Sequence, residues 1–253
     1  MDVAPGSVAV VIPAKDEADR IAATVASAQG IPSVDLVVVV DDGSTDSTQQ
    51  VARQAGALVV RHARNRGKAA AMETGAGAVD LHEQSSDGGG DVPPRALLFL
   101  DADLGETAAG TAPLVPPVLD GQADMTIAVL PKQMTAGGGR GLVVDLSRKG
   151  IVEATGWTPT QPLSGMRCLT RRAFTAALPL ARGWGVETAL TIDLLGQGFR
   201  VVEVPCDLQH RVTGTDLRAQ LHRAAQYRDV ARALAVRRAR RALRVARSRP
   251  SDG

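Results

Sequence analysis

The chain has 253 residues, of which 44% are hydrophobic and 2% aromatic, and its formal net charge is +2. This length suits one α/β domain with a substantial core, or a domain with a small extension. The scarcity of aromatic residues argues against a stacking surface for single-stranded nucleic acid, and no apolar run approaches the roughly 20 residues of a membrane span. Residues 1–7 lack a basic segment followed by an apolar signal region, so we expect a cytoplasmic protein.

Strand-like and helix-like segments alternate through the first half of the chain. Strands are predicted at 7–13, 36–40, 58–61, 96–100 and 124–129, and helices at 21–28, 47–54 and 68–79. This alternation predicts an α/β fold with a doubly wound, mostly parallel sheet and helices on both of its faces. Residues 82–95 are rich in glycine and proline and are predicted to form a surface loop.

The second half of the sequence is less regular. Strands are predicted at 166–170 and 199–204, and helices at 142–154, 187–197 and 216–247. Cys168 and Cys206 lie in strand-like contexts, which favours two buried free thiols over a disulfide.

Charge divides the chain near residue 215. Residues 1–215 carry a balance of −6 and residues 216–253 a balance of +8. We therefore expect one domain over 1–215 and a C-terminal helical basic extension over 216–253 that packs on the same domain. An apolar stripe in the first half of the extension predicts packing on the body or on a second subunit, in a homodimer. For its arginine-rich end we expect a solvated helix or a loose peripheral contact with an anionic membrane surface, and no nucleic-acid partner.

Two acidic clusters follow apolar strand-like runs. Asp41 to Asp46 come directly after one predicted strand, and Asp101 and Asp103 after another. Because ligands of open α/β sheets bind beyond the carboxyl ends of the strands, both clusters are expected to face one crevice. Crowded carboxylates suit a divalent cation, and Mg²⁺ or Mn²⁺ on Asp101 and Asp103 would leave coordination positions for phosphate oxygens. The alternative for Asp41 to Asp46 is ordinary turn and helix-cap chemistry.

Several side chains near these strand ends could hold a nucleotide. The first predicted strand ends with groups that could contact a nucleobase, namely Pro13, Ala14 and Glu17, although Glu17 could also be a helix N-terminal charge. Asp42 and Ser44 could bind the base or ribose. Lys68 opens a predicted helix, where its charge opposes the helix dipole, and this favours an ammonium that binds phosphate.

At these residues the chain resembles nucleotide-sugar-dependent glycosyltransferases of the GT-A fold, especially family 2. The segment from Val11 to Glu17 resembles the family's opening strand and turn, and Asp41 to Asp46 its second-strand signature. Asp101-Ala102-Asp103 stands where the family has its metal-binding Asp-x-Asp motif. The resemblance implies a metal-dependent transferase in which Asp103 is catalytic.

Further segments resemble those of glucosyl-3-phosphoglycerate synthases within this family. They are Arg66-Gly67-Lys68, the glycine-rich 137–141, the segment 183–187 and Gln209-His210-Arg211. The resemblance implies acceptor contacts from Gly139, Arg140 and Trp184. It also implies an acceptor-side role for Glu187 and a late metal ligand at His210, beside Asp101 and Asp103.

The expected activity is metal-dependent transfer of a sugar from a UDP- or GDP-linked donor to a small, anionic acceptor. An inverting transferase needs a general base, for which Glu187 is favoured over Asp193, whereas a retaining one needs none. A polyprenyl-phosphate sugar transferase at the membrane surface and a nucleotidyltransferase that makes nucleotide sugars are the alternative enzymes. A degenerate, non-catalytic binding module is a third class, against which the intact Asp101, Asp103 and His210 argue.

Overall fold

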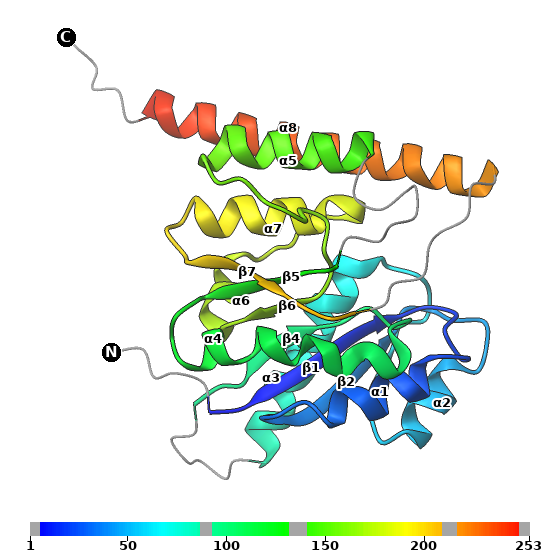
Figure 1. Ribbon diagram of the computed structural model, residues 1–253. Coiled ribbons are helices and arrows are strands. Elements are labelled where there is room, and N and C mark those ends of the chain that lie inside the picture. The colour runs from blue at the N-terminus through cyan, green and yellow to red at the C-terminus, as the bar shows by residue number, and fades with distance from the viewer. Residues whose placement is uncertain (1–5, 87–92, 132–140, 209–216, 248–253) are drawn as a thin grey trace.

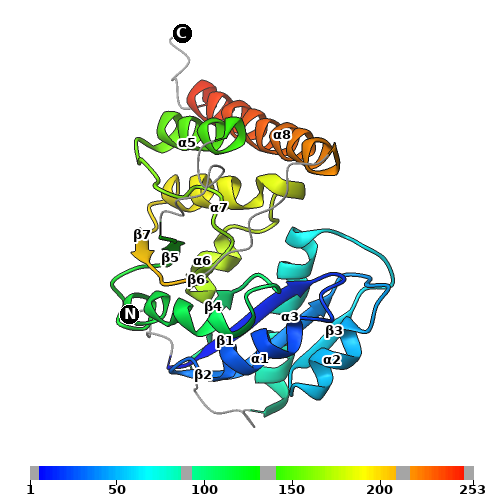
Figure 2. The same ribbon diagram turned by 45° about the vertical axis from the view of Figure 1, so that its right-hand side comes forward.

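The computed structural model describes residues 6–86, 93–131, 141–208 and 217–247 of the chain. Within these residues a seven-stranded sheet has the strand order β3-β2-β1-β4-β6-β5-β7. The strands are β1 (Val8–Ala14), β2 (Val34–Asp41), β3 (Leu58–Arg61), β4 (Ala96–Phe99), β5 (Met125–Val129), β6 (Arg167–Leu169) and β7 (Val201–Pro205). Figures 1 and 2 show the sheet crossing the body of the molecule with helices on either side.

The sheet is mostly parallel, as the alternation of elements predicts. β1 pairs in parallel with both β2 and β4, β2 with β3, and β5 with β7. β6 is the exception, because it runs antiparallel to β4 on one side and to β5 on the other. All three of its residues are buried, so alternation of buried and exposed positions gives no sign of the direction of the strand.

Helices cover both faces of the sheet, which confirms the predicted layers. The α-helices are α1 (Ile21–Gln29), α2 (Thr48–Gln54), α3 (Lys68–Ser86), α4 (Pro116–Leu119), α5 (Leu142–Thr155), α6 (Arg171–Ala176), α7 (Val186–Leu195) and α8 (Leu217–Arg247). Two 3₁₀ helices, η1 (Gly105–Leu114) and η2 (Gly183–Gly185), also lie within the described residues. One apolar cluster joins the sheet to α1, α2 and η1, and a second joins its other face to α3, α6 and α7.

Alternate residues of β1 supply these two clusters. Val8, Val10 and Ile12 belong to the first, and Ala9 and Val11 to the second. This follows from the two-residue period of a strand that is buried on both faces. On the α3 side the approach is close, since a Cβ atom at Gly75 would lie 2.3 Å from Cγ1 of Val11.

The predicted loop at 82–95 is wrong in its first part, because α3 continues to Ser86. Glu83 explains the extension. Its carboxylate accepts a hydrogen bond from the Arg95 backbone N–H at 2.9 Å and lies 3.2 Å from Nη2 of Arg171. Tertiary ion pairs of this kind hold the last turns of a helix and leave no local sequence signal.

The basic helix α8 lies alongside α5 and above α7 in both views (Figures 1 and 2). Val230 and Leu234 of α8 pack with Ile151 and Ile192 in a third apolar cluster. The described part of the predicted apolar stripe thus contacts the body, while the domain boundary at 215 stays a prediction. Arg237 departs from the predicted solvated end, since it is buried and forms an ion pair with Asp193. Within the described ranges, no helix combines the length and the apolar character that crossing a membrane requires.

Both cysteines are buried free thiols, as the sequence predicts. Burial raises the pKa of the Cys168 thiol to about 12 and that of Cys206 to about 11. Thiolate is the reactive form, so we expect neither thiol to react with Ellman's reagent in the native chain at pH 8. Two thiols should react in denaturant, where the pKa returns to about 8.5.

The control for this prediction is the pH dependence of the native reaction. Reactivity should rise only toward pH 11. The raised thiol pKa should stabilise the folded state fully below the unfolded thiol pKa, and this stabilisation should be lost as the pH rises through the folded pKa. One fast-reacting thiol at pH 8 in the native chain would contradict the burial of that cysteine.

Candidate functional site

The two acidic clusters meet at one edge of the sheet. β1 lies between β2 and β4 and is parallel to both, so the three strands end on the same side. Ala14 pairs with Asp41, and the next backbone N–H, that of Asp42, donates to the Ala14 carbonyl at 2.8 Å. Asp101 follows β4, whose continuation is held by a hydrogen bond from the Leu100 N–H to the Val11 carbonyl at 3.1 Å.

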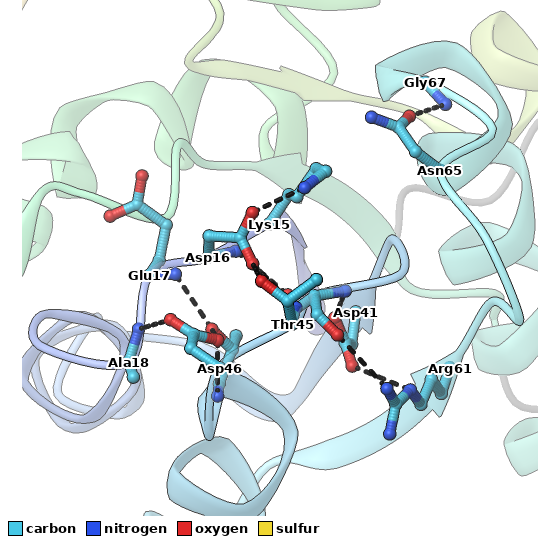
Figure 3. A network of polar contacts seen from close by, with 12 residues as sticks. Lys15, Asp16, Glu17, Ala18, Asp41, Thr45, Asp46, Arg61, Asn65 and Gly67 are labelled. Carbon is cyan, nitrogen blue, oxygen red and sulfur yellow. Dashed lines mark hydrogen bonds and ion pairs between the residues drawn. The ribbon is translucent and has the colours of Figure 1, made fainter.

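Asp16 ties the loop after β1 to the loop after β2 (Figure 3). Its backbone has φ +54°, and its N–H donates to Oγ of Ser44 at 2.9 Å. Its carboxylate accepts from the Thr45 N–H at 2.7 Å and pairs with the Lys15 ammonium. The hydrogen bonds from Lys15 and Thr45 lower the pKa of Asp16 to about 2, so the carboxylate stays ionised. The left-handed backbone is therefore fixed from both sides.

Asp46 makes a second tie between the same loops. Its carboxylate accepts from the backbone N–H of Ala18 at 3.1 Å and of Thr48 at 3.0 Å. The Glu17 N–H donates to Oγ1 of Thr48 at 2.8 Å, while the Glu17 carboxylate points away from this network in Figure 3. Turn and helix-cap hydrogen bonds thus explain the position of the Asp46 carboxylate. For Glu17 they explain the backbone N–H contact and not the position of the carboxylate.

Asp42 holds the loop that leads into α3. Its nearly buried carboxylate accepts from the backbone N–H groups of Arg66 and Gly67, at 2.8 and 2.7 Å. Nδ1 of His62 lies 2.7 Å from the same carboxylate, and Nε2 lies 2.9 Å from the Thr74 hydroxyl. The predicted nucleotide contact at Asp42 is therefore also the anchor that positions Lys68. His62 has no role predicted from the sequence, since a lone histidine after a strand has no distinctive pattern.

Lys68 lies between two carboxylates from distant parts of the chain. Its Nζ is 2.8 Å from Oδ1 of Asp101 and 3.0 Å from Oε1 of Glu187. Burial alone would lower the pKa of Lys68, but the charges and hydrogen bonds of Asp101 and Glu187 raise it well above its ordinary value. The ammonium therefore remains charged, and it joins the carboxyl end of β4 to the first turn of α7.

The backbone of the Asp101–Asp103 segment is held by α1 and by Arg20, the residue before α1. The Thr24 hydroxyl donates to the Ala102 carbonyl at 2.8 Å, and Nη1 of Arg20 donates to the Asp103 carbonyl at 3.1 Å. These bonds use backbone oxygens, and the Asp103 side chain has no ion pair with any residue that the structure describes. Two carboxylates two residues apart are hard oxygen donors, which fit Mg²⁺ or Mn²⁺.

The described residues alone do not complete a metal site. Among them, no group of three or more His, Cys, Asp or Glu side chains could hold a metal ion. The predicted third ligand, His210, lies outside the described residues, as do the predicted acceptor contacts Gly139 and Arg140.

Arg167 is a buried residue that the sequence did not reveal. It is 1% exposed, and its guanidinium donates to the carbonyls of Ser164, Glu187 and Pro162 at 2.8, 3.0 and 3.2 Å, and to Oγ1 of Thr191 at 2.9 Å. Burial lowers the pKa of Arg167 to about 10, so it is still a cation at neutral pH. Arg167 therefore fixes the start of α7, and with it Glu187. An arginine at the start of an apolar strand is the one signal that could have revealed it.

The remaining predicted residues are dispersed. Pro13 is half-buried and Ala14 buried at the end of β1. Trp184 is 42% exposed in η2, where its backbone N–H donates to Oδ2 of Asp229 on α8 at 3.3 Å. The structure thus brings Asp101, Lys68 and Glu187 into contact and leaves the predicted acceptor wall at Trp184 a prediction.

Comparison with known proteins agrees with this arrangement. A sequence model described as glycosyl transferase family 2 matches residues 9–143, which include nearly all of β1, the strands β2 and β4, and both acidic clusters. The chain belongs to glycosyl transferase family 2. The predicted GT-A fold is confirmed by crystal structures of a family member from Mycobacterium tuberculosis, glucosyl-3-phosphoglycerate synthase.

One of these structures contains Mn²⁺, uridine diphosphate and phosphoglyceric acid, with a TM-score of 0.67, 28% identity, and coverage of 91% of this chain and 78% of that chain. Another contains Mg²⁺ and uridine diphosphate, with a TM-score of 0.67, 27% identity, and coverage of 91% and 79%.

Relatives in this family are longer than the present chain. Glucosyl-3-phosphoglycerate synthase from Mycolicibacterium paratuberculosis is 31% identical over 204 residues, which are 74% of this chain and 59% of the relative. Glycosyltransferase AglJ from Haloferax volcanii is 26% identical over 222 residues, which are 84% of this chain and 66% of the relative. The chain therefore spans about two thirds of one family member and less of the other.

Gly165 gives a direct test of the Lys68 contacts. A Cβ atom there would lie 2.5 Å from Nζ of Lys68 and 2.7 Å from Oδ1 of Asp101, so Gly165→Ala must displace the pair. We expect a loss of about 1–3 kcal/mol in the free energy of unfolding, typical of overpacking, measured by urea titration.

Gly77→Ala is the matched control. Gly77 lies in α3, and a Cβ atom there would have no neighbour within 4 Å, so this substitution should keep or raise stability by up to about 1 kcal/mol through helix propensity. Equal stability of the two variants would contradict this prediction, because it would show that a methyl group at position 165 fits without displacing Lys68 and Asp101.

Proposed function

We propose that this chain is a metal-dependent glycosyltransferase that moves a sugar from a nucleoside diphosphate sugar to a small anionic acceptor. The observation that carries the proposal is the ammonium of Lys68, held 2.8 Å from Asp101 and 3.0 Å from Glu187 at the edge where three parallel strands end. A fixed cation beside paired carboxylates is the environment in which a diphosphate leaving group and its metal ion are stabilised.

The donor nucleotide is proposed to lie across the ends of β1 and β2. Pro13 and Ala14 offer an apolar surface and backbone groups for the base, and the Glu17 carboxylate, which points away from the loop network, is proposed to contact a polar edge of the base (Figure 3). Asp42 and Ser44 already accept hydrogen bonds from backbone N–H groups, so their proposed role is mainly to hold the loops that border the nucleotide site. The uridine diphosphate in the mycobacterial structures makes UDP the first nucleotide to test.

Asp101, Asp103 and His210 are the residues that would hold Mg²⁺ or Mn²⁺. When bound, the ion would supply positive charge to the diphosphate as it departs. Lys68 would add its own charge on the same side, and Asp101 keeps the ammonium in place. Because Arg20 and Thr24 hold the backbone of this segment, the carboxylates need little reorganisation to receive the ion.

The acceptor is proposed to bind on the α7 side. Glu187 is 8% exposed and lies in the first turn of α7, where it orients Lys68 and faces the same space as Asp101. It could orient a sugar or acceptor hydroxyl, or act as the base of an inverting reaction. Arg140, in the glycine-rich segment 137–141, is proposed to bind the acceptor anion, and Trp184 to form part of its wall. The phosphoglyceric acid in the mycobacterial structures makes 3-phosphoglycerate the first acceptor to test.

The donor half of the proposal predicts metal-dependent nucleotide binding that requires Asp103. At a ligand concentration of one hundred times Kd, UDP with Mn²⁺ should stabilise the chain by about 2.7 kcal/mol, seen as a rise of several degrees in Tm. EDTA should abolish the rise. Asp103→Ala should abolish it too and leave the Tm without ligand unchanged, because this carboxylate is half-buried at a loop and contributes little to the core.

Asp120→Ala is the control for charge, since Asp120 ends α4 outside the site. It should keep the full rise. GDP and ADP are tested in parallel, and a chain whose Tm responds to no nucleotide in the presence of Mn²⁺ would refute the proposed donor site.

The acceptor half predicts a selective effect of Arg140→Ala. Loss of a guanidinium that binds the acceptor anion should raise the acceptor KM about tenfold or more and change the donor KM little. The assay follows UDP release with 3-phosphoglycerate, a neutral monosaccharide and a short polyprenyl phosphate as acceptors. Arg53→Ala, an exposed arginine of α2, is the control. Turnover only with the neutral sugar, or only with the polyprenyl phosphate, would overturn the small anionic acceptor while leaving the donor site intact.

A further inference from the structure

A cavity of about 920 Å³ lies between α5, α7 and α8, beside the C-terminal end of α6. Its lining includes none of the residues that the structure brings together at the candidate functional site. Asp193, the base candidate that the sequence favours less than Glu187, lines this cavity, where it pairs with Arg237. Figures 1 and 2 place the three helices together above the sheet, with α8 alongside α5. The volume lies within the range of about 300–1,000 Å³ that is typical of small-molecule sites.

The lining of this cavity has an apolar part and a basic part. The apolar part includes Ala154, Leu178, Pro179, Ile192 and Leu234. The basic part consists of arginines from two turns of α8, namely Arg237, Arg238, Arg240 and Arg241. Asp193 and Glu153 are the acids of the lining, so the arginines exceed them by two charges.

Arg237 is the innermost of these arginines. Its side chain is 8% exposed, its Nη2 forms an ion pair with Asp193 of α7, and its Nη1 donates to the Ala233 carbonyl at 3.2 Å. Its Nε is buried without a hydrogen-bond partner among the described residues. Because Nε is closed off from solvent, Arg237 contributes fixed positive charge to the wall of the cavity and no hydrogen bond to a ligand.

Neighbouring contacts hold the rest of the basic wall in place. Arg238 pairs with Glu153, and Nη1 of Arg241 donates to the carbonyls of Glu153 and Ala154 at 3.0 and 3.4 Å, at the end of α5. Arg240 is exposed and has no ion pair with the part of the chain that the structure describes. The cavity thus combines fixed arginines with one arginine whose charge is available to a ligand.

We propose that this cavity binds a phosphate ester that carries an apolar group. The phosphate would accept hydrogen bonds from the exposed Arg240 guanidinium and would lie beside the positive charges of Arg238 and Arg241. The apolar group would cover Leu178, Pro179 and Ile192. The proposal is independent of the proposed glycosyl transfer, because the two sites share no residue.

The test is calorimetric titration of the full chain with octyl phosphate, below its micelle concentration and in the presence of saturating UDP and Mn²⁺. In the proposed donor site the nucleotide and metal would fill the other phosphate-binding region, and the Arg240→Gln and Leu178→Ser variants assign any remaining binding to the cavity. Inorganic phosphate lacks the apolar group and octyl glucoside lacks the anion, so each should bind at least about tenfold more weakly than octyl phosphate. Equal binding of octyl phosphate and inorganic phosphate would overturn the apolar half of the proposal.

Arg240→Gln should weaken octyl phosphate binding about tenfold, since it removes one charge-assisted contact. Arg232→Gln is the matched control, because it removes the same charge from an exposed position of α8 outside the cavity. Leu178→Ser, at a position 44% exposed, should weaken octyl phosphate and leave inorganic phosphate unchanged. Equal effects of the two arginine substitutions would show general electrostatic attraction and overturn the site.

Vesicles distinguish a soluble ester from a lipid headgroup. Sedimentation with phosphatidylcholine vesicles that contain phosphatidic acid, lost in Arg240→Gln and retained in Arg232→Gln, would support the cavity with a membrane lipid as its ligand. Octyl phosphate binding without vesicle binding would support it with a soluble ester. Vesicle binding without octyl phosphate binding would overturn the cavity. A dimer that Arg240→Gln dissociates, in a chain that does not bind octyl phosphate, would assign the cavity to a contact between two copies and overturn the proposal.

Discussion

The ion pairs of Lys68 with Asp101 and Glu187 are the contact on which the candidate site depends. They connect the first turn of α3, the loop after β4 and the first turn of α7, which are otherwise positioned by separate parts of the fold. Without the ammonium, two carboxylates would face each other in a largely buried space and repel. The cost of removing three charged groups from water is offset only because their geometry is held by neighbours, Asp42 on one side and Arg167 on the other.

These neighbours show how the loops at the edge of the sheet are stabilised. Asp16, Asp42 and Asp46 each accept hydrogen bonds from backbone N–H groups of a loop adjacent to their own. Turn chemistry and ligand chemistry are therefore compatible at this edge, since the carboxylates that fix the loops also place the ones that face the site. This is the usual division between a rigid scaffold and the loops that carry function.

The sequence predicted most of the first half of the fold because its signals are local. Apolar runs such as 36–40 and 96–100 have the length and composition of buried strands, and each is followed by acids at the edge where ligands bind. The antiparallel β6 was not predictable, since a three-residue buried strand has no directional pattern. Glu83, Arg167 and Arg237 were missed for one reason: each is held by a partner that is distant in the sequence, and no periodicity records such a partner.

For the candidate site, the sequence predicted which residues take part but not which of them contact one another. Asp101, Lys68 and Glu187 were each proposed separately, as metal ligand, phosphate cation and acceptor-side acid, and the structure places them in direct contact. The spacing of residues 68, 101 and 187 contains no information about a salt bridge, because the contact is created by tertiary packing. Gly139, Arg140 and His210 rest on the family resemblance alone.

The close approach of Gly75 to Val11 has a consequence for how the chain can change over evolutionary time. α3 is a stiff rod that rises about 1.5 Å per residue, so Lys68 lies about 10 Å along the helix from Gly75. A side chain at position 75 would push the helix away from β1 and displace Lys68 with it. We therefore expect positions 11 and 75 to covary among homologues, with a larger residue at one accompanied by a smaller residue at the other.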